Sequence, residues 1–378
     1  MTDRNGALSF IAVGDVAPQL HDNGDHLFTF TAPTLNASDF VLAQLETSYS
    51  ERGTRQLGGF RWRLPRRPPL GNITSMRKAG INIISFASNH ALDYGEESFF
   101  DTIDNLKKAD IGVVGVGKDL AEARTPLIVE KNGVRVAVLA YNSILPQGYD
   151  AAKDRPGCNP IKVSTYYEQV DWQPGTPPKI VTIPDEADFE RLKEDVRLAR
   201  AKADVVVVSQ HCGVHLVPDV LAQYQKTIAH AAVDEGADLV VQHHSHSAAG
   251  IEVYKGKAIF YGLGVFAHES VRGLLDDSVV KEHHEQYGLH IDEEWKLFPF
   301  PPESRKTLIV RASIDDKKVA RVVFLPCLIN QKVQAEILGK ADPRSQDVVG
   351  YFETLTKDQG FKTKFTWEGD EVVVTAAK

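Results

Sequence analysis

The sequence is poor in cysteine and has no long apolar run, and both shortages restrict what the protein can be. Only three cysteines, Cys158, Cys212 and Cys327, occur in 378 residues. They are too few and too scattered for a disulfide framework or a cysteine-rich zinc site. No apolar stretch approaches the length of a membrane span, and residues 1–6 lead into a strand without the apolar core of a signal peptide. We therefore expect a cytoplasmic protein without a membrane anchor.

Positive charge is also in deficit. The formal net charge is -8, from 43 lysines and arginines against 51 aspartates and glutamates. This balance argues against binding nucleic acid by bulk attraction to phosphate, so we expect no nucleic-acid partner. A hydrophobic content of 43% is enough for a full core. The oligomeric state stays open, a homo-oligomer included.

Apolar runs of strand length alternate with amphipathic segments of helix length from residue 8 to about residue 265. This alternation is typical of a layered α/β domain. The predicted helices cover residues 73–79, 96–108, 186–202 and 218–235. The predicted strands cover residues 8–14, 40–44, 81–86, 112–116, 134–141, 204–210, 237–242 and 258–263.

Two segments interrupt the alternation, at residues 142–184 and 267–304. Long insertions in compact domains are usually lids or binding loops. We take the second as a candidate lid with Trp295, Phe298 and Phe300 as its apolar contacts. A packing arm or a dimer contact is the alternative. The remaining histidines of this segment are expected at the surface: His268, His283, His284 and His290.

A β-hairpin at 306–325, a helix near 345–359 and two short strands are predicted beyond the second insertion. We therefore divide the chain into a main domain at 1–330 and a small C-terminal α+β extension at 331–378.

Side chains that bind metals follow four of the predicted strands. Open α/β sheets keep their sites at the carboxyl ends of strands. Carboxylate, amide and imidazole groups at such ends are what a divalent metal centre needs. The residues are Asp15, Asn89, His90, His211, His244 and His246.

A structural role is the alternative for most of these residues taken singly. Asp15 alone is more typical of a turn or a helix cap, and His211 alone of a hydrogen-bonded core residue. Glu46 follows another apolar run, and its alternative is a surface acid. Residues 88–95 could be a helix-capping loop. The group as a whole has no convincing structural explanation other than a site.

Three further observations concern the surroundings of this group. Asp93 could hold the ring of His90 by accepting its second N–H. We expect His243 to point elsewhere. Arg61 and Arg63 alternate along one strand or extended loop, and arginine forks suit carboxylate or phosphate, so we predict that one of them binds an anionic substrate. A solvated face is the alternative for this pair.

The chain resembles the CapA family of poly-γ-glutamate capsule biosynthesis proteins, in the metallophosphoesterase superfamily, from about residue 8 to residue 330. The motifs keep the order and spacing of the family. They are Gly-Asp at 14–15, Gln-Leu-Glu at 44–46, Ser-Asn-His-Ala-Leu-Asp-Tyr-Gly at 88–95, Asp-Thr-Ile-Asp-Asn-Leu at 101–106, Val-Gly-Val-Gly at 114–117, His-Cys-Gly at 211–213, His-Ser-His at 244–246 and Phe-Tyr-Gly-Leu-Gly-Val-Phe at 260–266.

The resemblance implies a four-layer α/β/β/α sandwich with a two-metal site. Asp15 would bind the first ion, and Glu46 would bridge both ions. Asn89 and His211 would bind the second ion, and His244 and His246 would be divided between the two. His90 would be the acid or electrostatic stabiliser near the leaving group, with Asp93 behind it.

Two departures from the family pattern matter most. Ala17 stands where the broad superfamily has the histidine of an Asp-x-His motif, which weakens the first ion's site. His215 stands where the family usually has a carboxylate, and we count it with the substrate-binding residues.

We expect hydrolysis of an ester or amide of a small, anionic substrate by water activated at one or two ions of manganese, iron, cobalt or zinc. Phosphoester cleavage and carboxylic ester, lactone or amide cleavage both stay open. The alternative is a non-catalytic capsule component that binds an anionic polymer.

Overall fold

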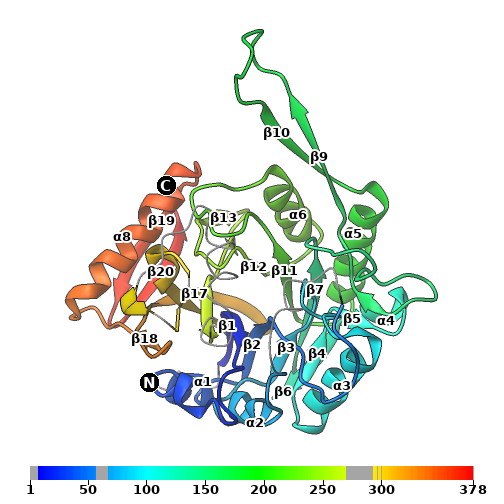
Figure 1. The fold of residues 1–378 in the computed structure, drawn as a ribbon. Coiled ribbons are helices and arrows are strands. Elements are labelled where there is room, and N and C mark those ends of the chain that lie inside the picture. The colour runs from blue at the N-terminus through cyan, green and yellow to red at the C-terminus, as the bar shows by residue number, and fades with distance from the viewer. Residues whose placement is uncertain (1–6, 57–66, 270–292, 296, 299, 378) are drawn as a thin grey trace.

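Two β-sheets packed face to face form the centre of the protein, and helices cover their outer faces (Figure 1). The computed structural model describes residues 7–56, 67–269, 293–295, 297–298 and 300–377. The four-layer α/β/β/α sandwich expected from the sequence is confirmed. Within these described ranges, no helix combines the length and the apolar character needed to cross a bilayer.

The first sheet combines parallel strands from the N-terminal part of the chain with antiparallel strands from the C-terminal part. Its order is β19-β20-β17-β16-β1-β2-β3-β4, with β15 also paired to β1 and β18 to β17. The bounds are β1 Leu8–Ala17, β2 Phe40–Leu45, β3 Ile83–Ser85, β4 Gly112–Val114, β15 Val265–His268, β16 Lys306–Asp315, β17 Lys318–Ile329, β18 Ala335–Ile337, β19 Thr363–Glu368 and β20 Glu371–Ala376.

The second sheet has the order β13-β14-β12-β11-β7-β6, and its central strands are parallel. Short strands β5 and β8 pair with each other beside it. The bounds are β5 Val116–Gly117, β6 Leu127–Lys131, β7 Val134–Asn142, β8 Gly157–Cys158, β11 Val205–Cys212, β12 Leu239–His244, β13 Ile251–Tyr254 and β14 Lys257–Phe260.

Helices α2 and α3 pack on the first sheet, and α5 and α6 pack on the second. Helix α8 closes one end of the sandwich beside β17 (Figure 1). The helix bounds are α1 Ala32–Asn36, α2 Gly71–Lys78, α3 Gly95–Lys108, α4 Leu120–Ala123, α5 Glu186–Arg200, α6 Gln223–Asp234 and α8 Pro343–Asp358. Short 3-10 turns lie at Asp25–Phe28 (η1), Glu293–Trp295 (η4) and Pro302–Arg305 (η5).

Strand β11 shows why an uninterrupted valine run suits an inner sheet. Side chains alternate between the two faces of a strand. Val205 and Val207 therefore join the apolar layer between the sheets, whereas Val206 and Val208 join the layer under α5 and α6. Both faces are dry, so each position gains from an apolar side chain. The run is explained by burial on both sides.

Several element bounds differ from those expected. The strands predicted to end at 14, 210 and 242 continue further, so Asp15, His211 and His244 lie inside β1, β11 and β12. Each of the three strands keeps a partner strand at these positions. The helix predicted at 218–235 begins only at Gln223. Pro218 and the residues after it form a turn instead.

The insertion at 142–184 carries a two-stranded arm, β9 Val163–Glu168 and β10 Lys179–Pro184, that projects from the body (Figure 1). In the second insertion, residues 270–292 lie outside the described residues, and His283, His284 and His290 with them. Phe298 is fully buried, and Trp295 and Phe300 pack against the same apolar cluster. The described residues of this segment therefore contribute side chains to the core.

The hairpin and helix predicted for the C-terminal part are confirmed as β16, β17 and α8. The predicted extension at 331–378 contributes β18, β19 and β20 to the first sheet. The three cysteines are buried free thiols.

Candidate metal centre

Gly14, next to Asp15 in β1, allows the backbone of this strand to approach a neighbouring loop closely. A Cβ at Gly14 would lie 2.0 Å from the carbonyl oxygen of Gly264. That carbonyl accepts a hydrogen bond from the Asp15 N–H at 3.0 Å. The pairing of β1 with β2 shifts register between Ala12 and Asp15. The close approach of the two backbones therefore requires glycine at position 14.

Asp15, Glu46 and His211 come together although they are far apart in the sequence. One ligand atom from each lies within 4.8 Å of the others, and all three side chains are fully buried. Asp15 comes from β1, Glu46 follows β2, and His211 is the last residue but one of β11. The carboxyl ends of strands from both sheets thus meet at one place.

Glu46 lies between two groups of polar side chains. Its Oε1 is 3.1 Å from His211 Nε2, and that nitrogen is 2.7 Å from Asn89 Oδ1. Its Oε2 is 3.6 Å from His246 Nε2, which is also 3.6 Å from Asp15 Oδ2. The Ser88 hydroxyl donates to Oε1 at 3.1 Å. One carboxylate therefore faces both groups with different oxygens.

His244 and His246 have unusual backbone conformations. Their φ angles are +83° and +52°, in a region that residues other than glycine rarely adopt and that clusters at functional sites. The His244 ring lies 4.9 Å from the ring of His211 and 6.3 Å from that of His246. The His244 N–H donates to Asp15 Oδ2 at 3.2 Å. The turn thus brings both imidazoles to the centre.

His90 lies at the edge of the centre, and Asp93 contacts its ring on the side away from Glu46. Its Nδ1 is 2.8 Å from Asp93 Oδ2, and the other oxygen of Asp93 accepts from the Tyr149 hydroxyl at 3.1 Å. On the opposite side of the ring, His90 Nε2 lies 3.2 Å from Asn89 Nδ2 and 3.7 Å from Glu46 Oε2. The contact with Asp93 is the one that the sequence predicted.

Burial and proximity act in opposite directions on the charged groups. Burial raises the pKa of Glu46, but the imidazoles of His211, His246 and His90 outweigh it and hold that pKa well below its usual range. Burial lowers the pKa of His211 well below its usual range, although Glu46 opposes this. Burial likewise lowers the pKa of His244 to about 4. Neutral imidazoles and an ionised carboxylate are the forms that bind metals.

The donors at this centre fit a divalent transition ion. They combine carboxylate, amide and imidazole groups, a mixture that suits manganese, iron, cobalt or zinc. Asp15 Oδ1 is buried and has no hydrogen-bond partner in the described part of the chain, and the same holds for His211 Nδ1 and His244 Nδ1. The ionised carboxylate of Glu46 in a dry interior needs a compensating positive charge. A divalent cation would supply it.

Two histidines lie here against expectation. His243, which we expected to point elsewhere, is buried with its Nδ1 3.4 Å from Asp15 Oδ1. His268, which we expected at the surface, is buried, and its ring lies 5.3 Å from that of His246. His268 is in β15, paired in register with Ala17 of β1. The pairing of these two strands has no local signal in the sequence.

His215 reaches the same centre from the loop after β11. Its Nε2 lies 3.1 Å from His246 Nδ1, and its ring lies 5.5 Å from that of His244. The other two residues expected to bind substrate, Arg61 and Arg63, lie outside the described residues.

A four-layer sandwich with these side chains at its strand ends is the arrangement that the resemblance in the motifs implied. Residues 9–270 match the family model described as "Bacterial capsule synthesis protein PGA_cap". The chain belongs to this family, and the resemblance noted in its motifs is confirmed.

Two relatives with known names match this chain over segments of similar length. The chain is 28% identical over 261 residues to the PGA biosynthesis protein CapA of Bacillus subtilis, covering 69% of this chain and 61% of that protein. It is 30% identical over 255 residues to a probable polyglutamine synthesis accessory protein of Mycobacterium tuberculosis, covering 63% and 60%. The match thus spans about three-fifths of each relative. Among solved structures, a phosphatase from Mycoplasma pneumoniae aligns with 90% of this chain and 97% of its own, at 14% identity and a TM-score of 0.49.

Proposed function

We propose that this protein is a metal-dependent hydrolase that cleaves an ester or amide bond in a small anionic substrate. The observation that carries the proposal is the position of Glu46, whose two oxygens face His211 on one side and His246 on the other. A carboxylate in this position is suited to hold two ions together. Asp15 and His246 would hold the first ion, and His211 and Asn89 the second, with His244 beside both groups.

The ions, when bound, would supply the positive charge that polarises the substrate and makes water a stronger nucleophile near neutral pH. The chain's own part is to fix the donors. Ser88 and the backbone N–H of His244 hold the carboxylates of Glu46 and Asp15 by hydrogen bonds. The surrounding burial excludes bulk water and strengthens each of these interactions.

His90 is suited to give a proton to the leaving group. Asp93 accepts at Nδ1, which fixes the orientation of the ring and leaves Nε2 on the side of Glu46. The His90 side chain is 18% exposed, whereas that of Glu46 is fully buried. His90 therefore lies where a substrate would enter. A positioned acid of this kind contributes about 10²- to 10⁴-fold in rate.

His215 would contribute to substrate binding. Its Nε2 contacts Nδ1 of His246, and this contact would fix the orientation of the His246 ring. We further propose that Arg61 or Arg63 binds the anionic group of the substrate.

The test is a hydrolysis assay over phosphomonoesters, phosphodiesters, carboxylic esters, lactones and γ-glutamyl amides, with Mn²⁺ added after chelation. His211→Ala should abolish the activity that Mn²⁺ restores. His230→Ala is the matched control, because His230 also contacts a carboxylate, Glu252 at 2.7 Å, on the outside of the second sheet. No activity on any class with Mn²⁺, Fe²⁺, Co²⁺ or Zn²⁺, together with no bound ion after gentle purification, contradicts the proposal.

A second candidate is a binding component of polymer assembly. One relative is named an accessory protein of polyglutamine synthesis, which favours this candidate. It would bind an anionic polymer without cleaving it. Binding of poly-γ-glutamate that persists in chelator and in His211→Ala, with no turnover, would support it over the hydrolase.

A further inference from the structure

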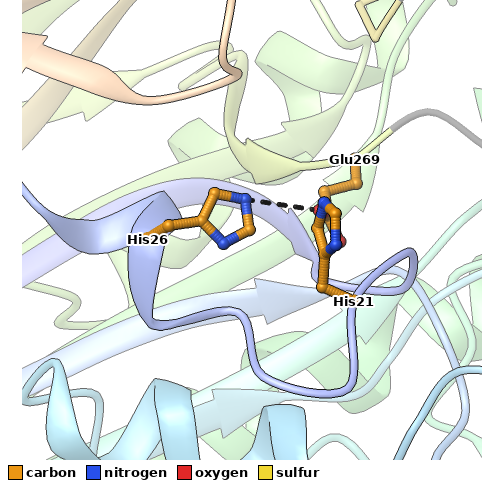
Figure 2. Close-up of side chains that lie close together, drawn as sticks. All are labelled: His21, His26 and Glu269. Atoms are coloured by element: carbon orange, nitrogen blue, oxygen red, sulfur yellow. Dashed lines mark ion pairs between the residues drawn. The ribbon is translucent and has the colours of Figure 1, made fainter.

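A second cluster of potential metal ligands lies where the loop after β1 meets the end of β15. It consists of His21, His26 and Glu269 (Figure 2). One ligand atom from each lies within 4.8 Å of the others. None of the three belongs to the centre around Glu46, although Glu269 directly follows His268 in the chain. Figure 2 shows the two imidazoles approaching the carboxylate from the same loop.

Glu269 is fixed before any ligand arrives. Its side chain is 3% exposed. One carboxylate oxygen, Oε2, accepts hydrogen bonds from the backbone N–H groups of Gln19 at 2.8 Å and Leu20 at 2.7 Å. The side chain of Gln19 also donates to the Glu269 carbonyl at 2.7 Å. These bonds set the plane of the carboxylate and leave Oε1 turned towards the histidines.

The two histidines are held by their backbones. The His21 carbonyl accepts from Asn72 Nδ2 at 3.0 Å. The His26 carbonyl accepts from Thr29 Oγ1 and from Gln334 Nε2, each at 2.7 Å. Asn72 lies in α2 and Gln334 lies in the C-terminal part of the chain, so these two hydrogen bonds tie the loop to both regions. The side chains themselves stay accessible, 57% exposed for His21 and 38% for His26.

The distances suit ligands that share an ion. Oε1 of Glu269 lies 3.5 Å from Nε2 of His21 and 3.6 Å from Nε2 of His26. Such separations are long for a charge-assisted hydrogen bond, which is about 2.7–2.9 Å. In a tetrahedral site with bonds of about 2.0–2.1 Å, neighbouring ligand atoms are about 3.3–3.4 Å apart. The two rings meet edge to face, with centroids 4.8 Å apart.

We infer that His21, His26 and Glu269 form a second, separate site for a divalent transition ion, zinc in the first place. Two imidazoles and one carboxylate are a donor set that zinc accepts, with water completing the coordination. The exposed side of both histidines leaves room for that water and for entry of the ion. A bound ion would connect the loop after β1 to the end of β15. Strand β1 is the strand that carries Asp15.

The test counts ions per chain after dialysis against Zn²⁺. His21→Ala and His26→Ala should each bind one ion fewer than the wild type. Both side chains are partly exposed, so folding is expected to persist, and near-UV circular dichroism checks it. Glu269→Gln, which keeps a carbonyl oxygen for the two backbone N–H groups, should weaken this site at least tenfold.

His230→Ala is again the matched control and should bind as many ions as the wild type. Co²⁺ gives an independent signature, because its visible absorption is stronger in four-coordinate than in six-coordinate sites. His26→Ala should lose one such component, and His211→Ala should keep it. An unchanged ion count in both His21→Ala and His26→Ala overturns the inference and leaves an imidazole–carboxylate contact only. A His211→Ala protein that binds as many ions as the wild type would instead count against the metal centre of the proposed hydrolase.

Discussion

Acidification should destabilise the metal-free protein, because imidazoles of the centre are buried in the neutral form. Burial lowers the pKa of His244 from its ordinary 6.5 to about 4, and it lowers that of His211 well below its usual range. In the unfolded chain both recover their ordinary values. Between the two pKa values the unfolded chain binds protons that the folded protein does not. The stability is therefore complete above pH 6.5 and is lost as the pH falls towards the folded pKa.

The size of the loss follows from these shifts. For His244 alone, a change from pH 7.5 to pH 5.5 should lower the free energy of unfolding by about 1.3 kcal/mol, at about 1.36 kcal/mol per pKa unit. The lowered pKa of His211 acts in the same direction and adds to this loss. The lowered pKa of Glu46 acts only near and below its ordinary 4.5, outside this range.

Denaturant unfolding in the presence of a chelator at the two pH values measures this loss. His244→Gln should remove its share, so its loss between the two pH values should be about 1.3 kcal/mol smaller than that of the wild type. Other histidines titrate equally in both proteins and cancel in the comparison. Equal losses in the wild type and in His244→Gln would refute the reasoning.

Other substitutions test the packing and the positioning of the site. Gly14→Ala should destabilise the protein by roughly 3 kcal/mol in denaturant unfolding, because its Cβ would meet the Gly264 carbonyl oxygen at 2.0 Å; a change below 1 kcal/mol contradicts this. Phe352→Ala should cost about 3–5 kcal/mol in the same assay, because that ring is fully buried; a cost near that of an exposed position would count against it. Asp93→Asn should lower kcat about tenfold to a hundredfold, part of the contribution of a positioned acid, with an unchanged ion count because Asp93 acts through His90; loss of an ion would show a different role.

Local patterns predicted the strand cores well, and long-range pairing decided the rest. The alternation of β11 between two dry layers is visible in its valines. The end of β1 is not, because Asp15 to Ala17 stay in the strand through pairing with β15, which is some 250 residues away in sequence. The same pairing buries His268. His243 was not recognised, because β12 continues past its predicted end at residue 242 and takes this histidine into the strand.

The convergence of the candidate metal ligands was predicted from the rule that strand ends share an edge. Their exact partners were not, because the two sheets bring Glu46 and His211 together from separate layers. The positive φ angles of His244 and His246 also have no signal in the residue types, which normally avoid that conformation.

The pairing of β16 with β1 has a consequence for any shortened form of this protein. Leu8 to Val13 pair antiparallel with β16, and β17 continues the sheet to β20. The family match ends at residue 270, before all of these partners. A chain cut there would leave β1 with a bare edge beside an apolar surface, and such edges promote aggregation. We therefore expect a chain that ends at residue 270 to be less soluble than the full chain, because β16 and the strands beyond it cover this edge.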